Sequence, residues 1–168
     1  MEDRYEQLVK GFKDGLANLK DLVEELPSED AYDSGYEAAH AALAPIAWSK
    51  AVGDRIDTGK AQELLGITRQ ALAKRVTSGS LLGLPGRGTT YYPSWQFDSS
   101  RRAIRPEVRK ILRFFSERGE GDPYMIATWM MAPNRDLDGA KPAEWLQDGR
   151  EVNRLLQAAR QVAERWSS

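Results

Sequence analysis

The 168-residue sequence contains no cysteine, which excludes a disulfide framework, a thiol nucleophile and a cysteine-ligated metal. Its one histidine, His40, has no cysteine or carboxylate pair nearby, so a structural role is favoured over metal binding or catalysis. No apolar run approaches the roughly 20 residues that a membrane helix needs. The acidic, amphipathic start does not have the character of a signal peptide. We therefore expect a cytoplasmic protein that requires neither a membrane nor a cofactor.

The sequence also lacks the usual signatures of an enzyme. Asp136 and Asp138 lie in one loop, and Glu144 and Asp148 lie one helical turn apart. Neither pair comes with a histidine, a cysteine or a glycine-rich phosphate loop. Carboxylates beside turns and at helix starts commonly serve as caps. We therefore do not expect catalytic activity.

The net charge of −1 hides a strong asymmetry along the chain. Residues 1–57 hold 6 Lys and Arg against 13 Asp and Glu, a balance of −7. Residues 58–118 hold 12 against 4, a balance of +8, and residues 119–168 hold 6 against 8. A surface that binds phosphates requires such a local excess of positive charge. The middle third of the chain is therefore the candidate for nucleic-acid binding.

Residues 57–97 have the pattern of a helix-turn-helix followed by a small wing. Asp57 or Thr58 can cap a first short helix, and Gly66 ends it as the residue best able to adopt a positive φ. Thr68 then caps a second helix, which we expect to end near residue 77. Its outward side chains suit base edges and phosphates in the major groove of duplex DNA. These are Arg69, Gln70, Ala73, Lys74 and Arg75.

A short hairpin, residues 81–84 and 89–92, is expected to form the wing, with Arg87 at its tip. The aromatic residues of 91–97 either anchor this wing to the helices or stack on bases, and anchoring is the favoured interpretation. Residues 98–105 form a polar connector that extends the positive patch. Phosphate contacts there would add affinity without sequence information. The connector supplies Arg101, Arg102 and Arg105.

The remaining segments are predicted to be helical. Apolar residues recur at three- and four-residue steps over 2–26, and that stripe either folds back on the chain or pairs with another copy in a dimer. A second helix is expected over 34–52, split or restarted at Pro45. Three predicted domains follow, at residues 1–53, 54–118 and 119–168. Further helices are expected at 106–118, 122–131, 143–147 and 150–166.

The C-terminal third resembles a known domain. The stretch ATWMMAPNRDLDGAKPAEWLQDG, followed by EVNRLLQAAR, is similar to the C-terminal domain of Xre/MbcA/ParS-type antitoxins. The resemblance implies a type II antitoxin, which represses its own operon through DNA and neutralises a RES-domain toxin that degrades NAD. It also implies a partner-binding role for the motif and its neighbour Trp145. The residues concerned are Trp129, Met130, Pro133, Asn134, Leu137, Gly139, Pro142, Trp145 and Leu146, with Gly149 closing the motif.

The DNA-binding part departs from the usual Xre-like bundle and is closer to a MerR-like or excisionase-like module. About fifty N-terminal residues are also additional to the resemblance. A regulator without a toxin, or a phage accessory factor, therefore remains an alternative function. In every case we expect a mainly α-helical protein with a helix-turn-helix, a small β-wing and a C-terminal helical domain.

Overall fold

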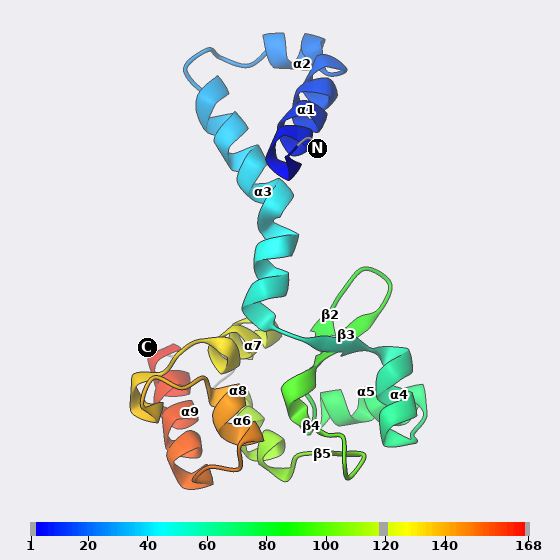
Figure 1. Ribbon diagram of the computed structural model, residues 1–168, viewed down its shortest axis with the longest axis vertical. Coiled ribbons are helices and arrows are strands. Elements are labelled where there is room, and N and C mark those ends of the chain that lie inside the picture. Colours follow the sequence, from blue (N-terminus) through cyan, green and yellow to red (C-terminus); the bar gives the residue numbers. More distant parts are fainter. Residues whose placement is uncertain (1–2, 118–120, 167–168) are drawn as a thin grey trace. The chain divides into compact units, whose positions relative to one another are not determined.

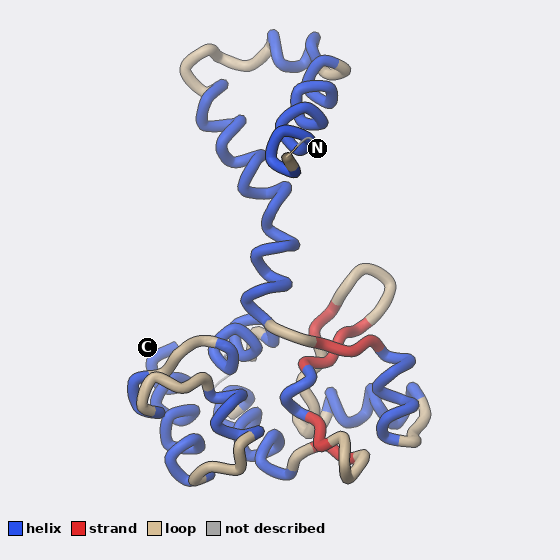
Figure 2. The backbone as a smooth tube through the Cα atoms, in the orientation of Figure 1, coloured by secondary structure: helices blue, strands red, loops and turns tan. Residues whose placement is uncertain are grey.

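The computed structural model describes residues 3–117 and 121–166. Helices dominate these ranges and the strands are short (Figures 1 and 2), so the predicted mainly α-helical class is confirmed. The chain divides into two compact units, Met1–Ile46 and Ala47–Ser168. None of the described helices is long and apolar enough to cross a membrane.

The first unit consists of α1 (Arg4–Ala17), α2 (Lys20–Glu24) and most of α3 (Ala31–Val52). The single helix predicted over 2–26 is wrong, because the helix is interrupted at Asn18 and Leu19. Asn disfavours helix interiors, since its side chain competes for the backbone. The predicted break at Pro45 is also wrong, because α3 continues through that residue. Its neighbours there are mostly alanine, the strongest helix former.

The second unit contains two small antiparallel sheets (Figure 2). β1 (Arg55–Asp57), β3 (Thr90–Pro93) and β2 (Leu84–Pro85) pair in that order, so β3 is central. The β2–β3 pairing agrees with the predicted hairpin, although its strands are shorter, and β1 was not predicted.

The second sheet pairs β4 (Phe97–Asp98) with β5 (Ala103–Ile104). The prediction that residues 98–105 form only a connector is therefore wrong. The Asp98 carboxylate accepts hydrogen bonds from the backbone N–H groups of Ser100 and Arg101, and this turn brings the two strands together.

Two short helices follow β1, and their ends form as the sequence indicates. α4 (Thr58–Leu65) begins at Asp57, whose carboxylate accepts from the Lys60 N–H at 2.8 Å. It ends at Gly66, which adopts a φ of 65°. α5 (Arg69–Thr77) begins at Thr68, whose hydroxyl accepts from the Ala71 N–H at 3.2 Å.

The rest of the second unit is helical and carries most of its core. A 3-10 turn, η1 (Ser94–Gln96), precedes the second sheet, and η2 (Arg135–Leu137) follows α7. The predicted helix 106–118 and the predicted domain boundary at 118/119 include residues outside the described ranges. The α-helices that follow the second sheet are α6 (Pro106–Ser116), α7 (Pro123–Met131), α8 (Pro142–Gln147) and α9 (Val152–Trp166).

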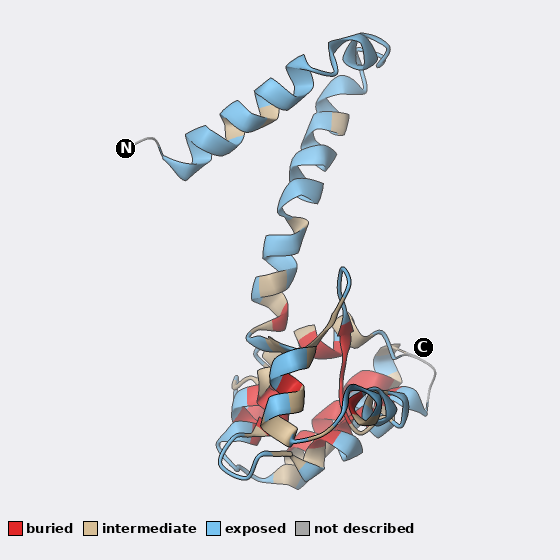
Figure 3. Ribbon diagram, turned by 90° about the vertical axis from the view of Figure 1, so that its right-hand side faces the viewer, coloured by how far each residue is buried: buried red, intermediate tan, exposed pale blue. Residues whose placement is uncertain are grey.

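Two hydrophobic clusters fill the second unit (Figure 3). The smaller one lies under α4 and α5 and contains Ala61, Leu72, Leu81, Tyr92 and Phe97. The larger one joins α6, α7, α8 and α9 to Leu82, Leu84 and Trp95. The predicted anchoring of the aromatic segment is confirmed at Tyr92, Trp95 and Phe97, which are all buried.

Candidate nucleic-acid interface

The outward face of α5 is exposed along its whole length. Leu72 is fully buried and Ala71 and Val76 are half-buried, which fixes the inward side of the helix. Gln70, Ala73, Lys74 and Thr77 follow the i, i+3, i+4, i+7 spacing of the opposite side. Arg69 and Arg75, both exposed, flank that line. The face therefore presents three cations and one amide without an acidic side chain, and it includes Thr77, which the sequence analysis did not single out.

A second basic element, the turn 99–102 between β4 and β5, lies against the end of α4. The Arg102 guanidinium donates to the backbone carbonyl oxygens of Glu63 and Leu64, at 2.6 and 3.2 Å. Carbonyls at a helix C-terminus lack intrahelical partners, so this arginine caps α4. Arg102 also has a φ of 51°, an uncommon value for a residue other than glycine. The sequence predicts a phosphate contact for Arg102, whereas in the structure this side chain connects two elements of the protein.

The other three predicted phosphate contacts differ from one another. Arg101 is highly exposed and lies 3.6 Å from the Asp98 carboxylate, beside the end of α4 that leads into α5. Arg105 is half-buried, and its Nε is buried without a hydrogen-bond partner. Arg87 is exposed in the β2–β3 loop, which points away from α4 and α5 in Figure 1. The structure therefore places the turn 99–102 beside the α4–α5 pair, and leaves Arg87 apart from it.

Most of the residues assigned to partner binding are buried. Their side chains build the larger core and do not form its surface. They are Trp129, Met130, Leu137, Pro142, Trp145 and Leu146. The remaining three are accessible: Pro133 and Gly139 are exposed and Asn134 is half-buried. Because they are buried, these six residues can contribute to partner binding only by shaping the segment between α7 and α8.

That segment is held by a network which the sequence did not reveal. The Asn134 side chain accepts from the Asp136 N–H, and the Arg154 Nε donates to the Asp136 carbonyl oxygen at 2.7 Å. Both Arg154 Nη atoms donate to the Asp138 carboxylate, at 2.8 and 2.6 Å. These hydrogen bonds hold the pKa of Asp138 below its usual value and raise that of Arg154. A lone arginine in a helix gives no sequence signal for such a bidentate contact.

Three of the four carboxylates considered as catalytic candidates are paired with basic side chains. Asp138 binds Arg154, Glu144 lies 3.1 Å from the Lys141 Nζ, and Asp148 lies 3.0 Å from an Arg150 Nη. His40 is exposed, with its ring 4.4 Å from the ring of Tyr36. Within residues 3–117 and 121–166, no group of three or more His, Asp or Glu side chains is arranged to hold a metal ion.

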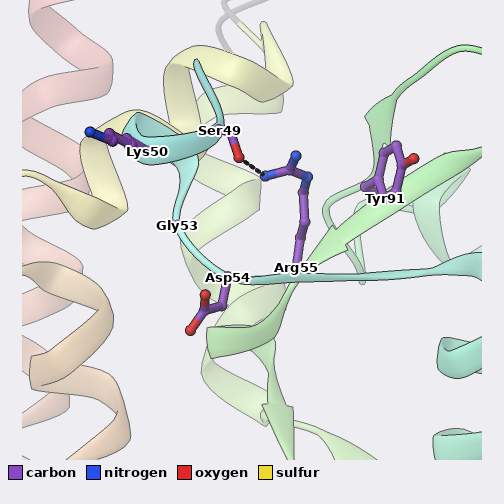
Figure 4. Close-up of a pocket in the computed structure, with 6 residues that line it drawn as sticks. All are labelled: Ser49, Lys50, Gly53, Asp54, Arg55 and Tyr91. Carbon is purple, nitrogen blue, oxygen red and sulfur yellow. Dashed lines mark hydrogen bonds between the residues drawn. The ribbon is translucent and has the colours of Figure 1, made fainter. Parts of the chain in front are cut away.

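A hollow of about 560 Å³ lies between the end of α3 and strand β1 (Figure 4). Arg55 crosses it, donating to the Ser49 hydroxyl at 3.0 Å and packing its guanidinium 5.3 Å from the centre of the Tyr91 ring. Lys50 and Asp54 also line the hollow, with their side chains pointing away from Arg55 and Tyr91 in Figure 4. The site offers a guanidinium to an anion but has no pair of groups suited to acid–base chemistry.

The arrangement therefore has one cationic helix face, one adjacent basic turn and a separate turn built on the motif residues. This set of features suits binding to a polyanion or a protein better than chemistry on a small substrate. Comparison of the chain with protein-family models, curated proteins and solved structures gives no match.

Proposed function

We propose that this chain is a DNA-binding transcription regulator of antitoxin type, in which α4 and α5 act as a helix-turn-helix. The observation that carries the proposal is the exposed face of α5, where Arg69, Gln70, Lys74 and Arg75 are free of acidic neighbours on the same helix. An α-helix fits the major groove, and arginine and glutamine pair bidentately with guanine and adenine. In this proposal Arg69 and Gln70 read bases, since the N-terminal residues of a recognition helix reach base edges.

The position of the turn 99–102 supports the same orientation of α5 in the major groove. Arg102 ties this turn to the end of α4, close in the chain to the N-terminus of α5. Arg101, which is exposed beside it, would then meet the phosphates next to the groove. Arg87 has a lesser part in this proposal, because its loop points away from α4 and α5 (Figure 1).

A charge-reversal experiment tests the DNA-binding part. Arg75→Glu is compared with Arg165→Glu, since each arginine is exposed in the last turn of its helix and each change costs a similar helix-dipole interaction. We expect Arg75→Glu to lower affinity for a duplex from upstream of the chain's own gene by about tenfold or more, and to flatten the salt dependence. Fluorescence anisotropy of the labelled duplex measures both quantities.

Arg165→Glu should leave both quantities close to those of the unmodified protein. A scrambled duplex of the same composition should bind more weakly, and Arg69→Ala should narrow that difference by about 1–3 kcal/mol. The proposal fails if Arg75→Glu and Arg165→Glu bind alike, or if no duplex binds in a salt-dependent way.

We also propose that α7, α8 and α9 bind a protein toxin of the RES type, so that the chain represses its own operon and neutralises that toxin. The support is the resemblance of residues 127–149, together with the rigid, accessible turn at 133–139 which those residues build. The alternative is a regulator without a toxin partner, including one of phage origin.

A pull-down of the tagged full chain from its native cell separates these two possibilities. We expect mass spectrometry to identify a RES-domain protein, and Arg135→Glu, a change at an exposed position of the turn, to reduce its recovery. Arg109→Glu, the same charge reversal at an exposed position of α6 in the second unit, is the matched control. Recovery of DNA without a RES-domain protein would favour the regulator without a toxin.

A further inference from the structure

The first unit exposes many large apolar side chains and buries none of its described residues. Exposure reaches 70% at Tyr5, 77% at Tyr32 and 58% at Tyr36. So many exposed large apolar side chains in one unit indicate a binding face, since folded proteins rarely leave large apolar areas uncovered. The exposed set is Tyr5, Leu8, Leu16, Leu19, Leu22, Val23, Leu26, Tyr32, Tyr36, Leu43 and Ile46.

The spacing of these residues is that of helices which pack lengthwise against other helices. On α3, steps of four, three, four and three residues connect Tyr32, Tyr36, Ala39, Leu43 and Ile46. That alternation is the a/d repeat of helical bundles and coiled coils, and it places all five on one side of the helix. We call this set the α3 seam. The side of α3 opposite the seam carries small residues such as Ala41.

α1 carries a similar line. Tyr5, Leu8, Phe12 and Leu16 follow three- and four-residue steps along one side of the helix. The two helical segments of the unit thus have matching apolar faces, joined by the short α2 and the segment that follows it. None of the described residues of the unit is buried, so its helices form no core of their own, and small helical units of this size need a further partner to form one.

The exposed area is sufficient for a dimer. An aromatic side chain presents about 150–250 Å², so the three tyrosines at their observed exposure contribute about 300–500 Å². Four exposed leucine and isoleucine side chains on the same two faces, Leu8, Leu16, Leu43 and Ile46, add to this value. A stable interface takes about 800 Å² from each partner.

We propose that this unit is a dimerisation module, in which the α3 seams of two copies of the chain pack together and the α1 helices complete a four-helix bundle. A two-fold interface joins the same patch on both copies, and a seam with one repeat along its length suits that symmetry. The bundle would bury the apolar residues that each copy leaves exposed.

The charge of the unit distinguishes a second copy from a basic partner. Residues 1–46 hold 4 Lys and Arg against 11 Asp and Glu, a balance of −7. Two copies therefore repel each other electrostatically while their apolar faces attract. Raising the salt concentration from about 0.1 M to about 1 M shortens the screening length from about 10 Å to about 3 Å. Dimerisation should accordingly strengthen with salt, whereas binding to a basic partner would weaken.

Sedimentation equilibrium of the full chain tests the proposal. We expect a mass of twice 18.9 kDa that persists or increases with salt. The double variant Leu43→Asp, Ile46→Asp places carboxylates in the seam and should weaken the dimer by at least about a hundredfold. Ala41→Asp, which adds a carboxylate to the opposite side of the same helix, should leave the mass unchanged.

Far-ultraviolet circular dichroism and tryptophan fluorescence of each variant establish that the second unit has kept its fold. A monomeric unmodified chain at all salt concentrations overturns the proposal. So does a dimer that survives the double seam variant, or one that Ala41→Asp disrupts equally. A dimer that dissociates as salt increases also contradicts it, because that result would indicate an interface held by opposite charges.

Discussion

At the scale of single residues, the Gln96 side chain connects more of the second unit than a lone glutamine in the sequence suggests. Its side chain is fully buried. It accepts from the Leu82 N–H at 2.6 Å, and it donates to the carbonyl oxygens of Leu82 and Pro93 at 2.9 and 3.3 Å. The amide thus pairs with backbone groups that have no water to bind. It fixes the segment before β2 against the turn after β3.

We predict that Gln96→Leu destabilises the protein by about 2–4 kcal/mol. Leucine fills a similar volume but leaves the Leu82 N–H and C=O unpaired in the core, and each such group costs about 1–3 kcal/mol. Urea denaturation followed by tryptophan fluorescence measures the change. Gln157→Leu on the exposed side of α9 is the control and should stay within about 0.5 kcal/mol of the unmodified protein. Equal effects of the two variants would contradict the role given to Gln96.

Single residues also show where sequence reasoning stops. Asp57, Gly66 and Thr68 could be assigned as caps because their roles depend on neighbours within four residues. Gln96 and Arg154 could not, because the bonds of Gln96 to Leu82 and of Arg154 to Asp136 and Asp138 span 14 to 18 residues and neither residue belongs to a local pattern. Arg102 is an intermediate case. Its charge was noted, but its contact with carbonyls 38 and 39 residues earlier in the chain changes its role.

At the scale of elements, the turn between α4 and α5 depends on one backbone conformation. Gly66 adopts a φ of 65°, and a Cβ added there would meet no atom within 4 Å. The cost of replacing Gly66 therefore comes from its backbone conformation and not from a clash of the new side chain. We predict that Gly66→Ala lowers the free energy of unfolding by about 1–2 kcal/mol, the cost of a left-handed conformation for an L-residue.

Gly59, inside α4, provides the matched comparison. Its backbone is helical, and an added Cβ would come no closer than 3.4 Å to the Asp57 carboxylate. Gly59→Ala should therefore raise stability by about 0.4–1 kcal/mol, since alanine reduces the freedom of the unfolded chain. Thermal or urea unfolding measures the change in the free energy of unfolding for both variants, which should be negative for Gly66→Ala and positive for Gly59→Ala. A stabilising Gly66→Ala would show that the turn tolerates another conformation.

In the second unit, α4 to α9 were predictable to within a few residues because their caps and apolar spacing are local. α5 and α7 begin at the capping residues Thr68 and Asp122, and α6 begins at Pro106. Short strands were harder to predict from the sequence. β1 has three residues and β5 has two, too few for an alternating pattern, and each forms only because a partner strand lies beside it. The candidate DNA-binding face of α5 could be predicted from its helical period, whereas its proximity to the turn 99–102 required the fold.

At the scale of the whole molecule, the two units differ in what stabilises them. The second unit contains both hydrophobic clusters, and it contains all five tryptophans of the chain. The first contains no buried residue among those described, so its helices depend on whatever covers their apolar faces. Two units with separate sources of stability do not satisfy the conditions for a single cooperative unfolding transition.

We therefore predict that two spectroscopic signals will separate on heating. Far-ultraviolet circular dichroism reports helices of both units, whereas tryptophan fluorescence reports only Ala47–Ser168. If the first unit dimerises, a helical signal should be lost at a lower temperature than the fluorescence change. That first midpoint should rise with protein concentration, since association stabilises only the folded form. The second midpoint should stay constant.

In the Leu43→Asp, Ile46→Asp variant the first transition should lose its concentration dependence, while Ala41→Asp should retain it. Coincident midpoints from both signals at every concentration would show instead that the chain unfolds as one body, and that the first unit derives its stability from the second.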